Sequence, residues 1–202
     1  MEENIYSATI TSVSPFVCAH LNAHLPSPEP RTKITLYQGL PKGDKMEFLI
    51  QKCVECGIHS VYPVQMTRSV AKINEKESEK KNIRHQRIAN EASKQAGRAH
   101  IPRIFPIISQ KTLLNMITSH SICLIAWEEG TKPLKEVLNA VSDTVHDIAL
   151  VIGPEGGIAK EDMHAFEDAG AIPITLGKRI LRTETAGLAG LIMILTLLGD
   201  YE

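Results

Sequence analysis

The stretch IALVIGPEGG spans residues 148–157, and LGKRILRTETA spans residues 176–186. The first begins with a short apolar, β-branched run, which is typical of a buried strand, and ends in a loop that is mostly glycine. Glycines at the carboxyl end of a parallel strand let a ligand approach the backbone and its N–H groups. The second follows a strand predicted over 172–176 and contains three cations and a carboxylate. The two loops together predict a ligand crevice at one edge of a parallel sheet.

The glycine spacing excludes two common nucleotide-binding loops. The dinucleotide fingerprint G-x-G-x-x-G does not match glycines at 153, 156 and 157, and no Gly-Lys-Ser/Thr follows to make a phosphate loop. For Gly-Pro-Glu-Gly-Gly alone, a plain glycine turn remains a structural alternative. The combination of both loops is much more specific.

With both motifs, the chain resembles the SPOUT class of S-adenosylmethionine-dependent RNA methyltransferases, and within that class the RsmE type. Residues 40–47 (LPKGDKME) and residues 91–98 also match this type, whereas Met66-Thr67 replaces a more usual Ser-Glu pair. The resemblance implies methylation of N3 of a uridine in small-subunit (16S) ribosomal RNA. It implies S-adenosyl-L-methionine as cofactor, S-adenosylhomocysteine as product, a C-terminal trefoil knot and a homodimer.

Strand and helix patterns alternate from Lys33 onward. Apolar strands are predicted at 34–37, 61–64, 104–108, 122–126, 148–152 and 172–176. Such alternation indicates an α/β domain whose parallel sheet has helices on both faces. We therefore assign residues 33–202 to a SPOUT methyltransferase domain. Residues 1–32 are interpreted as two strands and a Pro-rich linker, a remnant of the small PUA-like β domain that the resemblance implies.

Composition limits the class of protein. The chain has 202 residues, is 43% hydrophobic, and shows no basic-plus-apolar leader pattern and no apolar run long enough to span a membrane. We expect a cytoplasmic protein without a membrane partner. Cys53 and Cys56 fall on a predicted helix among apolar residues, so we interpret them as core residues and expect no metal site.

The resemblance and the crevice together nominate residues at three strand ends as the cofactor site. Adenine is expected against aliphatic side chains and backbone amides of the last two loops. The candidate cofactor residues are Leu124, Ala126, Trp127, Ile152, Gly153, Pro154, Glu155, Gly156, Gly157, Leu176, Gly177, Ile180, Leu181, Arg182, Thr185 and Ala186.

Arg182 and Glu184 are the candidate catalytic residues. Uracil N3 bears a proton, so methylation there requires its removal, and a cation near O2 or O4 would stabilise the resulting imide anion. We assign that cation to Arg182. Glu184 would accept the proton or hold Arg182 in place, and a carboxylate that merely favours a helix N-terminus is an equal alternative.

A basic segment indicates a nucleic-acid partner. Between Arg68 and Arg103 there are ten Lys or Arg against four Glu, a local charge of +6 in a chain whose net charge is −1. On a helix predicted over 78–98 the cations form one stripe, which favours contact with phosphates, although a solvated face is an open alternative. The candidate RNA-binding residues are Lys42, Arg68, Lys80, Arg84, Arg87, Lys94 and Arg98.

Three further expectations follow from the sequence. The last helix, predicted over 185–198, is apolar nearly all round and must be covered, by a second copy or by the domain's own core. The aromatic residues, Tyr6, Tyr37, Phe48 and Tyr62 among them, are too scattered to indicate a base-stacking platform. Two rival functions are a non-catalytic RNA-binding protein on the same fold and another nucleotide-binding α/β enzyme.

Overall fold

The computed structural model describes residues 4–71, 73–130, 132–140 and 145–201. Its body is a sheet of strands that all pair in parallel, in the order β5-β4-β3-β9-β7-β10-β8, with β6 also on β4. This confirms the predicted α/β class. The strands are β3 (Lys33–Gly39), β4 (Ser60–Gln65), β5 (Arg103–Ile104), β6 (Ile108–Ser109), β7 (Ile122–Ala126), β8 (Lys132–Pro133), β9 (Asp147–Ile152) and β10 (Ala171–Thr175).

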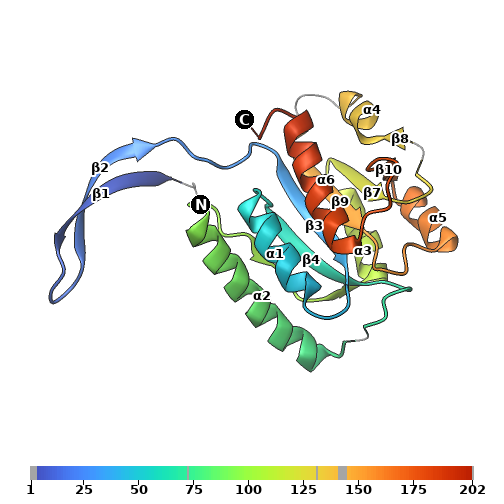
Figure 1. Cartoon of the computed structure of the whole chain (residues 1–202), viewed down its shortest axis with the longest axis horizontal. Coiled ribbons are helices and arrows are strands. Elements are labelled where there is room, and N and C mark those ends of the chain that lie inside the picture. The colour runs from blue at the N-terminus through green and yellow to red at the C-terminus, as the bar shows by residue number, and fades with distance from the viewer. Residues whose placement is uncertain (1–3, 72, 131, 141–144, 202) are drawn as a thin grey trace.

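Helices cover both faces of this sheet (Figure 1). One face packs against α1 (Lys45–Glu55), α2 (Glu75–Gln95), α4 (Leu134–Asn139) and α6 (Thr183–Leu197). The other packs against α3 (Gln110–Met116), the 3₁₀ turn η1 (Ile117–Ser119) and α5 (Lys160–Asp168). We call these the α6 face and the α3 face. Each has its own hydrophobic core, as expected for a parallel sheet.

β9 lies at the centre and explains why its sequence is apolar without alternation. Ile148, Leu150 and Ile152 belong to the core of the α6 face, whereas Ala149 and Val151 belong to the core of the α3 face. All five are buried. The strand ends at Ile152, so the predicted glycine loop, which begins at Gly153, leaves the middle of the carboxyl edge.

α6 approaches the sheet closely because it has glycines on its inner side. A Cβ on Gly187 would lie 2.7 Å from Gln38 Oε1, and a Cβ on Gly190 would lie 2.9 Å from a Leu150 methyl carbon. Larger residues would push the helix away from β3 and β9. The two glycines therefore set the position of the N-terminus of α6 over the carboxyl edge.

The N-terminal segment is an antiparallel hairpin of β1 (Ile5–Ser12) and β2 (Cys18–Leu25) that extends away from the body (Figure 1). This small sheet is consistent with the predicted PUA-like remnant. The linker that follows is fixed at two points. The carboxylate of Asp200 accepts hydrogen bonds from Thr32 N at 2.9 Å and from Arg31 Nε at 2.8 Å.

The second fixed point corrects a prediction. The side chain of Arg98 is only 7% exposed, because its guanidinium pairs with the linker carboxylate of Glu29 and donates to the carbonyls of Val54 and Ile58. Arg98 is therefore not on the basic stripe. The helix ends at Gln95, and Gly97, at φ 66°, turns the chain inward.

Other predicted elements differ at their ends. The strand predicted over 104–108 is two short strands, β5 and β6, and the helix α5 was not predicted from sequence.

No helix in the described residues is long and apolar enough to cross a membrane. Cys53 is fully buried, burial raises its pKa, and no cluster of metal-binding side chains occurs within the described residues.

Candidate functional site

A hollow of about 560 Å³ opens at the carboxyl edge of the sheet, at the ends of β7, β9 and β10. Its volume lies in the range of cofactor and small-molecule sites, roughly 300–1,000 Å³. The lining comes from 126–128, the loop 152–158, and the segment 175–183, with Lys45 and Ala186 at its margin. The three strand ends predicted to form one crevice do come together.

Fourteen of the sixteen candidate cofactor residues line this crevice, and two do not. Leu124 is fully buried in the core of the α6 face, two residues before the end of β7. Thr185 is exposed on the first turn of α6, outside the lining. Sequence reasoning missed other lining residues, which are Lys45, Glu128, Ile158, Thr175, Lys178, Arg179 and Thr183.

The GPEGG loop, residues 153–157, is held by hydrogen bonds from Thr183 and Arg68. Thr183 Oγ1 donates to the Gly153 carbonyl at 2.6 Å, and Arg68 Nη1 donates to the Gly156 carbonyl at 3.2 Å. A Cβ on Gly156 would lie 3.0 Å from both Cβ and O of Arg68. The loop therefore needs glycine at 156 to pass close to Arg68.

Thr183 also connects this loop to the middle of the sheet. Its hydroxyl accepts a hydrogen bond of 2.7 Å from Nε2 of Gln38, a fully buried side chain at the end of β3. Because Gln38 and Gly153 lie at the ends of neighbouring strands, one hydroxyl fixes the start of α6 against two of them. The position of the crevice loops therefore depends on the buried hydrogen bonds of Gln38, Thr183 and Gly153 as well as on the sequence of the loops.

Lys45 lies between the two loops of the crevice. Its Nζ is 3.0 Å from Oε1 of Glu155 and 3.8 Å from Oε2 of Glu184. Burial opposes ionisation of Glu155, but the backbone N–H of Lys42 and the ammonium of Lys45 outweigh it and lower its pKa. The first turn of α1 is thus tied to both sequence motifs.

The two candidate catalytic side chains have different surroundings. Arg182 is exposed beside the crevice and precedes the first residue of α6. Glu184 is on the first turn of that helix with its side chain only 13% exposed, and its buried Oε2 has no hydrogen-bond partner. It faces the ammonium of Lys45 and does not itself line the crevice.

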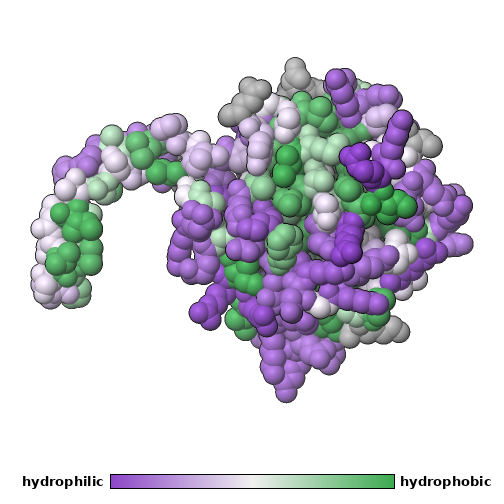
Figure 2. Space-filling model, in the orientation of Figure 1, coloured by the Kyte–Doolittle hydropathy of each residue, from purple (hydrophilic) through white to green (hydrophobic). Residues whose placement is uncertain are grey.

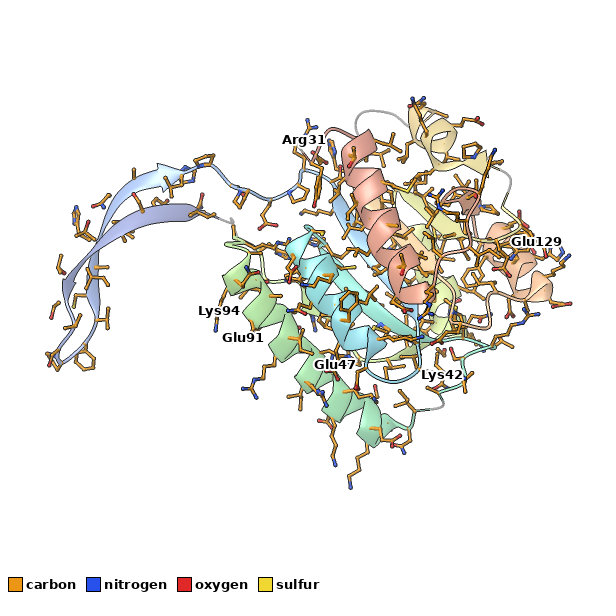
Figure 3. All side chains as sticks on the ribbon, in the orientation of Figure 1. Arg31, Lys42, Glu47, Glu91, Lys94 and Glu129 are labelled. Carbon is orange, nitrogen blue, oxygen red and sulfur yellow. The ribbon has the colours of Figure 1, made fainter. Side chains whose placement is uncertain are left out.

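The remaining candidate RNA-binding cations are exposed. Lys80, Arg84, Arg87 and Lys94 recur at helical spacing on the outer side of α2. Arg84 pairs with Glu47 of α1 at 2.7 Å, and Lys94 pairs with Glu91 at 2.9 Å; Glu47, Glu91 and Lys94 are labelled in Figure 3. Lys42 and Arg68 lie instead beside the GPEGG loop, so cations border the crevice.

Residues 27–195 match a family described as RNA methyltransferase domain. Ribosomal RNA small subunit methyltransferase E of Bacillus subtilis (strain 168) is 38% identical over 165 residues, which cover 79% of this chain and 64% of that protein. The protein of the same name from Mycobacterium bovis is 31% identical and is covered over 63% of its length. The match with this chain therefore spans less than two thirds of the length of these two relatives.

Solved structures are also similar to this chain in sequence and in fold. A crystal structure of ribosomal RNA small subunit methyltransferase E from Neisseria gonorrhoeae, bound to S-adenosyl methionine, superposes with a TM-score of 0.79 at 31% identity. The superposition covers 95% of this chain and 78% of that one. A crystal structure described only as a hypothetical protein gives a TM-score of 0.91 at 31% identity, over 98% of this chain and 80% of that one.

Proposed function

This chain belongs to the ribosomal RNA small subunit methyltransferase E family of RNA methyltransferases, and from that premise we propose that it methylates small-subunit (16S) ribosomal RNA. The methyl donor is S-adenosyl-L-methionine and the acceptor is N3 of a uridine. The observation that supports this most is the crevice at the ends of β7, β9 and β10, lined by both sequence motifs. A ribosomal RNA substrate would place the reaction in the cytoplasm.

The residues of the crevice suit the proposed cofactor. Gly177 has a φ of 116°, and a Cβ there would meet no atom within 4 Å. The backbone at this point of the lining is therefore open to a ligand. Ile180, Leu181 and Leu176 supply apolar surface for an adenine ring. S-adenosylmethionine brings an activated methyl group, so the protein's task is to orient it against the acceptor.

Two side chains of this protein would accept the N3 proton of uracil and stabilise the negative charge that its removal leaves. We assign the N3 proton to the carboxylate of Glu184, which lies on the first turn of α6 beside Lys45. Arg182 would stabilise the negative charge that develops on the uracil oxygens. Within the crevice, the GPEGG loop and the 175–183 segment would exclude water from the methyl group.

The RNA would be bound through its phosphates. The exposed cations of α2, with Lys42 and Arg68 beside the crevice, would supply positive charge to the phosphates. The target base would have to leave its stack to reach the crevice. A strong dependence of RNA affinity on salt follows from this mode of binding.

We also propose a homodimer through α6, with the C-terminal segment knotted as in the SPOUT class. Leu188, Ile192 and Met193 of this helix are only partly buried, and Leu197 is 39% exposed. Ile180, in the loop that precedes α6, is 90% exposed. Figure 2 shows an apolar area over α6 bordered by hydrophilic residues, which a second copy would cover.

Arg182→Ala tests the reaction. Transfer of a labelled methyl group to small ribosomal subunits that lack the modification should fall about 100- to 1,000-fold, while S-adenosylhomocysteine affinity changes little. Lys135→Ala, an exposed change on α4, is the matched control and should leave transfer unchanged. Wild-type turnover by Arg182→Ala would refute its assigned role. RNA binding by the wild type without cofactor binding would support the non-catalytic alternative instead.

A further inference from the structure

The α3 face of the sheet has an area that no helix among the described residues covers. A second hollow, of about 340 Å³, lies at the amino ends of β3, β4 and β9, at the opposite edge from the cofactor crevice. Parallel sheets are normally covered on both faces. Here α3 and η1 cover Tyr37 and the centre of the sheet, whereas Thr35 and Ser60 form the floor of an open hollow. An uncovered area in this fold therefore needs an explanation.

Aromatic rings form one row beside this floor, although they are far apart in sequence. Tyr37 and Tyr62 pair across β3 and β4, with ring centroids 5.0 Å apart and planes 17° apart. Tyr62 and Phe105 stack at 3.9 Å and 5°. The guanidinium of Arg103 lies over the Phe105 ring at 4.5 Å. The fold thus brings together three rings that are scattered in the sequence.

Polar groups surround the same hollow. The hydroxyls of Thr35 and Ser60 share one hydrogen bond of 3.0 Å, and such a pair has a second proton to donate. Lys33 and Arg103 are exposed cations at its margin. The carboxylate of Asp147, whose side chain is 44% exposed, accepts from Nδ1 of His120 and is the acid in the lining.

We propose that this hollow binds one unpaired nucleotide of RNA, with the base over the edges of the Tyr62 and Phe105 rings and the phosphate at Arg103 and Lys33. Edge-to-face contact is a favoured arrangement of aromatic rings, and it tolerates any base. The hydroxyls of Thr35 and Ser60, on the floor of the hollow, offer a hydrogen-bond partner to the base edge. Cations beside the rings suit a phosphate. The proposal is independent of methyl transfer, because this site lies at the other edge of the sheet.

The test is a titration of the whole chain with uridine 5′-monophosphate, adenosine 5′-monophosphate and a single-stranded RNA hexamer. Binding is followed by the NMR signals of the Tyr62 and Phe105 rings. Phe105→Leu keeps apolar volume but removes a ring, and Arg103→Glu reverses the charge. Each should weaken mononucleotide binding at least about fivefold. Lys135→Glu, a charge reversal on α4 outside both hollows, should have no effect.

Several results would overturn the proposal. Absence of saturable shifts at millimolar nucleotide and hexamer would do so, as would shifts that persist unchanged in both variants. Mononucleotide binding without hexamer binding would assign the hollow to a free nucleotide and contradict the RNA part. Thermal unfolding of each variant is recorded first, so that a loss of binding is compared only between folded proteins. Failure here would leave the cofactor crevice unaffected, since S-adenosylhomocysteine binding is measured separately.

Discussion

Glu29→Ala should destabilise the protein strongly, because it leaves the buried guanidinium of Arg98 without its counter-ion. The two side chains are 9% and 7% exposed, and the carboxylate also accepts from the backbone amides of Ala99 and His100. Removing one partner of such a buried pair costs roughly 3–5 kcal/mol. In a chain of this size each kcal/mol lowers the unfolding temperature by about 2–4 °C. The free energy of unfolding should therefore fall by about 3 kcal/mol or more.

The assay is urea unfolding followed by the fluorescence of Trp127, the only tryptophan. Lys94→Ala is the matched control, because the Lys94–Glu91 pair has side chains 70% and 67% exposed. Exposed pairs contribute about 0–1 kcal/mol, so this variant should unfold almost like the wild type. If Glu29→Ala loses no more than Lys94→Ala, the linker is not fixed through this pair, and our correction for Arg98 fails.

The same carboxylate predicts a pH dependence. Burial works against ionisation of Glu29, but Arg98 and the two backbone amides outweigh it, so the folded pKa lies below its ordinary value. A depressed pKa means that the stabilisation is complete above the unfolded value of about 4.3 and is lost as pH falls through the folded value. The difference in stability between wild type and Glu29→Gln should thus shrink below about pH 4. A difference that grows with acid would contradict the sign.

Two further changes address the crevice. Gly156→Val would place a branched side chain against the backbone of Arg68. Calorimetry should show S-adenosylhomocysteine affinity reduced at least about tenfold. Unchanged affinity would mean that this loop is not at the ligand. Thr183→Val removes the hydroxyl between Gln38 and the Gly153 carbonyl. Urea unfolding should show a free energy of unfolding lowered by about 1–3 kcal/mol, and a decrease below about 0.5 kcal/mol would contradict the role of these hydrogen bonds.

The crevice was predictable because its signal is local. Apolar strands that end in glycine occur next to one another in the sequence, and the carboxyl ends of parallel strands meet at one edge. The predictions for Leu124 and Arg98 are wrong because a local sequence pattern does not show into which part of the structure each of these side chains points. Leu124 precedes the strand end by two residues and turns into the core. Arg98 follows a glycine that ends the helical repeat, so the stripe pattern no longer applies.

Features built from distant residues left no such signal. The row of Tyr37, Tyr62 and Phe105 exists because β3, β4 and the residue after β5 are in register, and no periodicity within one strand indicates it. The position of Lys45 between Glu155 and Glu184 likewise depends on how α1 packs beside two loops. Sequence patterns predict the existence and type of elements well, their ends less well, and contacts across elements poorly.

Calorimetric titration of the whole chain with S-adenosylhomocysteine, with ATP and NAD as controls, tests the central claim most directly. The account predicts saturable binding of S-adenosylhomocysteine alone, which Gly156→Val weakens and Lys135→Ala leaves unchanged. No binding to the folded wild-type protein, or equal binding of ATP or NAD, would contradict the assignment of the carboxyl-edge crevice to a methyl donor.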